Sequence, residues 1–274
     1  MIPVYVSNGA FVTRYNGRDY HHIATYAPLL HCDGVEFLMY CVWKDDVKAL
    51  RSFLKSTNLR FPVTHMDKQI GETLSEDGLK AKDKALKLFE RDLITASEIG
   101  SEKAVLHLWN GPFSDAKFDE VLELYAQMHD MAARRGILLT TENVTCVKNV
   151  CLDHLLKLRD LFPFARFTYD TKMAQLHGEN ELLAQEKYID LLISGAISHL
   201  HLNDTKPMPE MERLPIMHIG DGLVDFDSFF RLLKRSAYSG TATVESTSVN
   251  KDGSVDIEKL NRSLDRVRQE LNGV

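Results

Sequence analysis

The chain alternates short β-rich segments with amphipathic helical segments, and this alternation repeats eight times. The expected strands lie at residues 3–8, 34–40, 61–66, 104–109, 137–144, 165–171, 197–204 and 241–246. The expected helices lie near residues 18–31, 44–56, 78–99, 116–135, 150–161, 181–194, 225–236 and 256–271. Eight such units in roughly 250 residues are what a (β/α)₈ TIM barrel requires. We therefore predict an α/β fold, a closed barrel formed by residues 1–274 as one domain.

An open, doubly wound sheet is the main alternative to a closed barrel. That fold usually carries a phosphate-binding GxGxxG sequence after its first strand. The segment "SNGAF" after the first expected strand does not supply this sequence. No linker of low complexity divides the chain either, so the barrel is the simpler interpretation.

Composition and charge narrow the class of protein. Hydrophobic residues make up 44% of the chain, which is enough to fill a globular core. The net charge of −6 disfavours a protein that binds mainly to nucleic acid phosphates. No apolar run approaches the roughly 18 residues that indicate a membrane span, and the N-terminus does not resemble a signal peptide. Since the four cysteines form no CxxC pair, we expect reduced thiols, a cytoplasmic location and no membrane or nucleic acid partner.

Polar residues gather where the expected strands end. The residues at these ends are His65, His107, Glu142, Asn143, Asp170, His201, Asn203, Asp204 and Glu245. In a barrel of this kind, the carboxyl ends of the strands carry the active site. We therefore expect these side chains at one mouth of the barrel, with Asn203 and Asp204 orienting ligands or binding substrate hydroxyls.

Four of these residues come from consecutive strands and suggest a metal site. Glu142, Asp170 and Glu245 would repel one another in a partly dry pocket, and a divalent cation would remove that conflict. A mixed set of carboxylates with the imidazole of His201 suits Mn²⁺, Co²⁺, Mg²⁺ or Zn²⁺. The alternative is that each residue is a separate hydrogen-bonding group at the end of its strand.

The order of these short motifs resembles the xylose-isomerase-like TIM-barrel superfamily, which includes sugar phosphate isomerases and epimerases, ketose 3-epimerases and endonuclease IV. The motifs are "TTENV" (140–144), "YDT" (169–171), "HLHLNDTK" (199–206), "HIGDGLVDF" (218–226) and "TVES" (243–246). The resemblance covers nearly the whole chain. Taken singly the motifs are weak, but their order and spacing are fairly specific for the superfamily and much less so for a substrate.

The resemblance implies roles for individual residues. The metal ligands of the superfamily correspond to Glu142, Asp170, His201 and Glu245, and its ketose epimerases also use the two glutamates as the acid/base pair. A bound metal stabilises the enediolate that forms when a proton leaves the carbon beside a carbonyl. One carboxylate removes this proton, and the other can return a proton to the opposite face of the substrate.

Further residues are expected to bind substrate. They are His65, His107, Asn143, Lys206 and Arg213. In the endonuclease branch, the histidines equivalent to the first two help to bind a second and a third metal instead. His199 lies deeper on the face of His201, so we expect it to pack in the core or to support a ligand.

Two departures from the superfamily pattern weigh against the endonuclease. Met173 stands where the strand-six motif Asp-x-x-His has its histidine, and His218 is out of register in the loop after strand seven. The endonuclease uses both missing histidines to hold one metal. His177 or His218 would have to replace them through a shifted loop.

The sequence thus favours a metal-dependent isomerase or epimerase acting on a small sugar, a sugar phosphate or a related hydroxy-carbonyl compound. The alternatives are a dehydratase or other lyase acting on a polyol or keto-inositol, an endonuclease IV-like enzyme acting at abasic sites, and a barrel that binds without catalysis. The partner is expected to be a small carbohydrate. The oligomeric state is left open, with a homodimer as the commonest arrangement among soluble oligomers.

Overall fold

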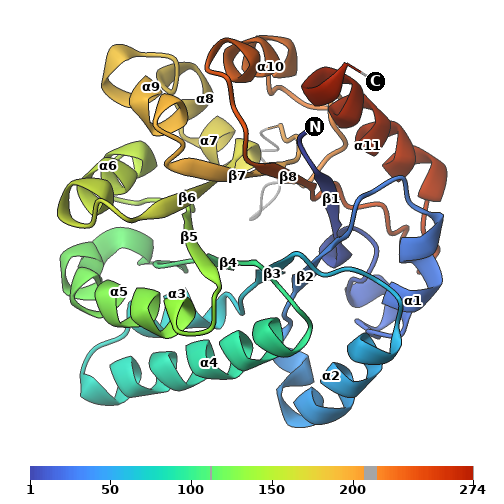
Figure 1. Ribbon diagram of the computed structural model, residues 1–274, viewed down its shortest axis with the longest axis horizontal. Coiled ribbons are helices and arrows are strands. Elements are labelled where there is room, and N and C mark those ends of the chain that lie inside the picture. Colours follow the sequence, from blue (N-terminus) through green and yellow to red (C-terminus); the bar gives the residue numbers. More distant parts are fainter. Residues whose placement is uncertain (112, 207–214, 274) are drawn as a thin grey trace. The chain divides into compact units, whose positions relative to one another are not determined.

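The computed structural model describes residues 1–111, 113–206 and 215–273. Within them, eight strands follow one another in chain order around a closed barrel (Figure 1). They are β1 Val4–Ser7, β2 Val35–Leu38, β3 Val63–His65, β4 Lys103–Leu106, β5 Leu138–Glu142, β6 Arg166–Asp170, β7 Ile197–Leu202 and β8 Thr241–Val244. Seven of them fall inside the segments expected from the sequence, and β4 begins one residue before its expected segment, 104–109. The predicted fold, a (β/α)₈ barrel, is confirmed.

Helices separate the strands, as expected. They are α1 His22–Tyr26, α2 Val47–Ser56, α3 Gln69–Leu74, α4 Leu79–Glu98, α5 Phe118–Ala133, α6 Cys151–Leu161, α7 Thr171–Leu176, α8 Glu179–Leu182, α9 Glu186–Ile193, α10 Phe226–Arg235 and α11 Ile257–Asn272. The expected helix at 181–194 is divided in two because Gln185 is extended between α8 and α9. None of the helices described is long and apolar enough to cross a membrane.

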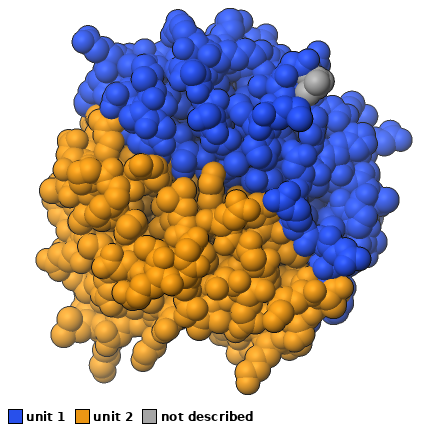
Figure 2. Space-filling view, in the orientation of Figure 1, with its two compact units in different colours: residues 1–36, 57–60, 169–274 blue, residues 37–56, 61–168 orange. Residues whose placement is uncertain are grey.

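The residues group into two compact units, coloured blue and orange in Figure 2. Unit 1 comprises residues 1–36, 57–60 and 169–274, and unit 2 comprises residues 37–56 and 61–168. Within unit 1, β7 pairs with β8, β8 with β1, and β1 with β2, all in parallel. Within unit 2, β3, β4, β5 and β6 pair successively in parallel. That residues 1–274 form a single domain stays a prediction.

The register between β7 and β8 places polar side chains together on one face. His199 lies opposite Thr241, and His201 lies opposite Thr243. Because side chains alternate along a strand, Leu200 points to the other face, where apolar residues are buried. A buried polar face requires hydrogen-bond partners, and this requirement shapes the site described next.

Candidate functional site

Three side chains from the ends of β6, β7 and β8 converge in unit 1. Asp170, His201 and Glu245 each offer a ligand atom, and these atoms lie within 4.8 Å of one another. Asp170 and His201 are buried, whereas the Glu245 side chain is 15% exposed. We call Asp170, His201 and Glu245 the acid-rich cluster. Solvent reaches this cluster on the side of Glu245.

Asn203 connects the two carboxylates of the acid-rich cluster. Its Nδ2 donates hydrogen bonds to Asp170 Oδ2 at 3.2 Å and to Glu245 Oε2 at 3.0 Å. Asp170 Oδ1 accepts from the backbone N–H of Met173 at 2.7 Å and thereby caps the start of α7. These hydrogen bonds hold the two carboxylates in fixed orientations, and the expected role of Asn203 toward a ligand or substrate stays a prediction.

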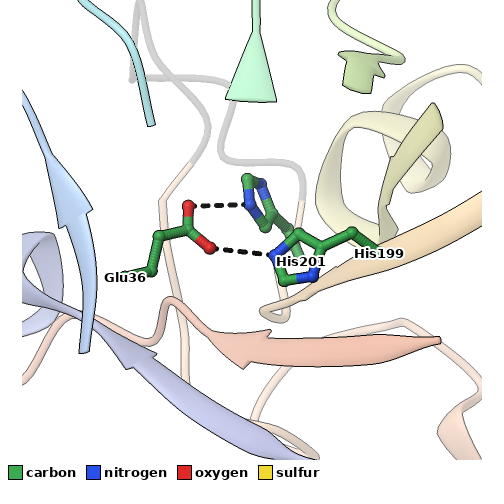
Figure 3. Close-up of side chains that lie close together, drawn as sticks. All are labelled: Glu36, His199 and His201. Carbon is green, nitrogen blue, oxygen red and sulfur yellow. Dashed lines mark hydrogen bonds and ion pairs between the residues drawn. The ribbon is translucent and has the colours of Figure 1, made fainter. Parts of the chain in front are cut away.

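His201 presents its two ring nitrogens to different carboxylates. Nε2 lies 2.9 Å from Glu36 Oε1, and Nδ1 lies 3.7 Å from Glu245 Oε1. Figure 3 shows the Glu36 carboxylate facing the rings of both His199 and His201. Burial raises the pKa of Glu36, but the charge interaction with His201 and the hydrogen bonds from His199 and His201 outweigh it, so that this pKa lies well below its usual value. Glu36 Oε2 lies 2.9 Å from His199 Nε2 and accepts a hydrogen bond from the hydroxyl of Thr243 at 2.6 Å.

The donor set of the acid-rich cluster fits a divalent cation. Two carboxylates and one imidazole nitrogen are ligands that such cations accept. The 3.7 Å between His201 Nδ1 and Glu245 Oε1 exceeds a hydrogen bond, yet it suits two ligands bound to one ion at about 2.0–2.3 Å each. The cluster has two carboxylates, those of Asp170 and Glu245, and one imidazole, so its acids outnumber its histidines.

A second cluster lies in unit 2 at the ends of β3, β4 and β5. His107 Nε2 is 2.7 Å from Glu142 Oε2, and His65 Nε2 is 3.2 Å from the same oxygen. All three side chains are at most 2% exposed. We call His65, His107 and Glu142 the histidine-rich cluster.

Hydrogen bonds fix the imidazoles of the histidine-rich cluster. His65 Nδ1 lies 2.8 Å from the backbone oxygen of Met66, which can only accept, so Nδ1 carries the proton. Burial lowers the pKa of His107 to about 4, although Glu142 opposes this change. His107 is thus neutral near pH 7, with its Nε2 2.7 Å from Glu142 Oε2 and its Nδ1 3.4 Å from Asn110 Oδ1.

The structure places the predicted site residues as follows. Asp170, His201 and Glu245 come together in unit 1, and Glu142 lies in unit 2 with His65 and His107. Asn143 is buried directly after β5, and Lys206 is exposed after β7. Arg213 lies outside the described residues. That Glu142 belongs to the same metal site as the acid-rich cluster stays a prediction.

Asp204 supports a loop, and the role expected of it toward a ligand or substrate stays a prediction. Its carboxylate accepts hydrogen bonds from the backbone N–H groups of Gly220, Gly222 and Val224 at 2.8–3.0 Å. A Cβ atom at Gly222 would lie 2.3 Å from Asp204 Oδ1, so only glycine fits there. The motif "HIGDG" is therefore bound to the end of β7 by one buried carboxylate.

His218 contacts two serine hydroxyls, and whether it replaces the histidine missing from the superfamily pattern stays untested. Its Nδ1 lies 3.0 Å from Ser263 Oγ and its Nε2 lies 3.2 Å from Ser248 Oγ. Burial is the main cause that lowers the pKa of His218 to about 4. His218 is a neutral core residue, whereas a role for His177 stays untested.

Glu36 was not among the residues expected from the sequence. The segment "GVEFLMY" has the pattern of a buried strand, and its single carboxylate lies within the strand and not at its carboxyl end. The sequence still contains a sign that Glu36 has a partner, because an acidic residue within a buried strand needs a buried partner. His199, which was expected to support a ligand or the core, is one of the two histidines that Glu36 contacts.

A family model described as xylose isomerase-like TIM barrel matches residues 30–269. The chain belongs to this family. No curated protein sequence matches the chain.

Solved structures share the fold of this xylose isomerase-like barrel at low sequence identity. A D-allulose 3-epimerase from Methylomonas sp. in complex with D-allulose has a TM-score of 0.72 and 18% identity, covering 98% of this chain and 97% of its own. A 3-keto-D-glucoside 4-epimerase from E. coli has a TM-score of 0.65 and 18% identity, covering 98% and 100%. The IOLI protein with a bound zinc atom has a TM-score of 0.72 and 12% identity, covering 99% of each chain.

Proposed function

We propose that this protein is a divalent-metal-dependent isomerase or epimerase that acts on a small sugar, a sugar phosphate or a related hydroxy-carbonyl compound. The observation that carries the proposal is the convergence of Asp170, His201 and Glu245, whose ligand atoms lie within 4.8 Å of one another. Glu142 is the proposed fourth ligand, on the grounds of its place in the strand-five motif "TTENV".

The proposed chemistry moves a proton beside a carbonyl group. A cation held by these residues would act as a Lewis acid toward the carbonyl and its neighbouring hydroxyl. Glu245 is the one member of the acid-rich cluster that solvent reaches, so a substrate can approach its carboxylate. Glu245 and Glu142 are the proposed pair that removes the proton and returns it to the other face. Asn203 holds Glu245 in place through its Nδ2.

Two kinds of observation support a carbohydrate substrate. The structurally similar proteins are named as epimerases of D-allulose and of a 3-keto-D-glucoside. Neutral, buried imidazoles such as that of His107 suit the recognition of hydroxyl groups. His65, His107, Asn143, Lys206 and Arg213 are the proposed substrate-binding residues. A cytoplasmic location and a homodimer stay expectations.

The test measures the incorporation of deuterium from solvent into a set of ketoses, ketose phosphates and aldoses. The protein is loaded with Mn²⁺ and incubated with each compound in deuterated water, and products are separated and examined by NMR and mass spectrometry. We expect an epimer or isomer with deuterium at the carbon beside the carbonyl. A Glu142→Gln, Glu245→Gln double variant is the matched blank.

Other results would assign the barrel to a different class. A product lighter by one water molecule indicates a dehydratase, and cleavage of a duplex with an abasic site indicates the endonuclease. Mn²⁺ binding without turnover of any compound in the set indicates a binding protein. Any of these three results, in the absence of an epimer or isomer, overturns the proposal.

A further inference from the structure

Three side chains that belong to neither cluster converge elsewhere in unit 2. Asp115, Cys146 and His154 each offer one ligand atom, a carboxylate oxygen, a sulfur and an imidazole nitrogen, and these atoms lie within 4.8 Å of one another. All three residues are buried. They come from three segments of unit 2, which are the 3₁₀ helix Ser114–Lys117, the loop after β5 and the helix α6. We call Asp115, Cys146 and His154 the thiol cluster.

Backbone and hydroxyl groups orient the carboxylate of Asp115. Its Oδ1 accepts from the N–H of Val147 at 2.6 Å and from the hydroxyl of Ser114 at 3.1 Å. The N–H of Lys148 lies between both oxygens, at 3.2 and 3.3 Å, and Oδ2 lies 2.8 Å from His154 Nε2. Most of these donors hold Oδ1, so Oδ2 is the oxygen that faces the other two members of the cluster. Hydrogen bonds of this kind orient carboxylates that bind metals.

Aromatic rings hold the imidazole of His154. The ring of Phe118 has its centroid 3.9 Å from that of the imidazole, and the ring of Trp109 has its centroid 5.3 Å away. These rings offer no oxygen to the imidazole, and they restrict its rotation by packing against it. The direction in which His154 presents a nitrogen to the cluster is therefore fixed by packing.

The thiol of Cys146 can lose its proton without leaving a buried acceptor unsatisfied. Cys146 Sγ donates to the backbone oxygen of Val144 at 3.5 Å, but Cys151 Sγ and Trp109 Nε1 donate to the same oxygen at 2.9 and 3.2 Å. A carbonyl oxygen has two lone pairs, so the two closer donors suffice for it. The sulfur of Cys146 is thus available to a metal ion, which binds the thiolate and releases the proton to solvent.

The donor set of the thiol cluster suits zinc. A thiolate is a soft ligand that selects Zn²⁺ over Mg²⁺, Ca²⁺ or Mn²⁺, and imidazole and carboxylate complete common zinc sites. Nitrogen and oxygen ligands of a tetrahedral zinc ion lie about 3.3 Å apart. Asp115 Oδ2 and His154 Nε2, now at 2.8 Å, have to separate by only about 0.5 Å to reach that spacing.

A cavity of about 360 Å³ connects the thiol cluster to solvent. Asp115 and His154 line it together with residues of the first turns of α5 and α6, among them Asp153. An ion held by three protein ligands keeps a fourth coordination position. The cavity gives an ion a path of entry and leaves room for a water molecule at that position.

We propose that Asp115, Cys146 and His154 form a second metal site, which binds Zn²⁺ and keeps a water molecule as its fourth ligand. The bound ion joins three segments of unit 2 that hydrogen bonds and packing already bring together. The inference does not rest on the proposed function, because neither the acid-rich cluster nor the histidine-rich cluster contains a cysteine.

The first test uses Co²⁺ as a spectroscopic probe for zinc. A cobalt ion bound to a thiolate has a charge-transfer absorption in the near ultraviolet, which a site without cysteine does not give. We expect this band in the wild-type protein and its loss when Zn²⁺ is added. We expect no band in Cys146→Ser and a full band in Cys151→Ser, the matched control that removes the neighbouring thiol. The absence of the band from the wild type, or its presence in Cys146→Ser, overturns the inference.

The second test measures the Co²⁺ affinity of the site from the same band, so that binding at other clusters does not contribute. His154→Gln removes a ligand and should weaken binding by at least about 100-fold, since loss of a mere partner of a ligand costs about 10–100-fold. Asp153→Asn changes a carboxylate in the same cavity that is not a ligand, and it should leave the affinity as in the wild type. Equal affinities in His154→Gln and the wild type overturn the inference.

A third test requires no variant and therefore decides the question if the substituted proteins do not fold. Wild-type crystals soaked in Zn²⁺ are measured on both sides of the zinc absorption edge. We expect an anomalous peak within bonding distance of Asp115, Cys146 and His154. The absence of a peak there overturns the inference, even if zinc binds at the acid-rich cluster.

Discussion

The acid-rich cluster and the histidine-rich cluster are built from the same kinds of side chain, yet they distribute charge differently. In the first, one imidazole lies with two carboxylates, those of Asp170 and Glu245. In the second, two imidazoles share one oxygen of a single carboxylate, Glu142. Because carboxylates outnumber imidazoles in the first cluster and imidazoles outnumber carboxylates in the second, we expect a cation to bind the first and a hydrogen-bonding ligand to bind the second.

The largest expected effect is on the rate of solvent exchange into substrate, and it follows from removing a proton-transfer group. Glu245→Gln and Glu142→Gln should each lower the rate of solvent exchange into substrate by about 10²–10⁴-fold, since general acid–base groups contribute that much. Mn²⁺ affinity should fall less, because an amide oxygen can still coordinate. Exchange is measured by NMR in deuterated water, with Glu181→Gln on the exposed surface of α8 as the control. Near-normal turnover in both variants would contradict the enediolate mechanism.

Substituting one histidine in each cluster should change the Mn²⁺ affinity by different amounts, and these changes are expected to be smaller than the losses of exchange rate above. His201→Gln is expected to weaken Mn²⁺ binding by at least about 100-fold, because loss of a mere partner of a ligand costs about 10–100-fold. His107→Gln should weaken it by about tenfold or less, since His107 would act only through Glu142. Calorimetry on both variants measures the difference. A larger loss in His107→Gln would reverse the roles assigned to the clusters.

The smallest expected effect is on the pH dependence of folding stability, and it comes from His218, which lies outside both clusters. The pKa of His218 is about 4 in the folded protein, below its ordinary value of about 6.5. The folded state therefore binds this proton less well than the unfolded state, so the stability it contributes is complete above pH 6.5 and is lost as the pH falls toward 4. Urea unfolding should show a smaller loss of stability between pH 7 and pH 5 in His218→Gln than in the wild type. An equal loss would show that His218 is not buried as a neutral residue.

The fold and the strand-end positions of Asp170 and His201 could be predicted from the sequence, because both follow from where the strands and helices lie. Strands alternating with amphipathic helices leave few architectures, and the carboxyl ends of barrel strands carry active sites. His201 and Asp170 could be assigned by reading where each strand ends. Their convergence with Glu245 in unit 1 agrees with that assignment.

Other features depend on contacts that the sequence does not display. Glu36 meets its histidine partners across a separation of more than 160 residues, and no local pattern indicates such a pairing. Asp204 stands at the exit of a strand, and the sequence does not show that its carboxylate accepts hydrogen bonds from the backbone N–H groups of Gly220, Gly222 and Val224. Short-range patterns thus locate a polar strand end without showing which partner it has.

The most direct test of the central claim is to locate a bound cation. Crystals grown with Mn²⁺ would be measured on both sides of the manganese absorption edge, and the anomalous difference map would place the ion without reference to any assumed ligand. We predict a peak within bonding distance of Asp170, of Glu245 and of Nδ1 of His201. A peak found only beside His65 and His107, with none at Asp170 and His201, would contradict the account.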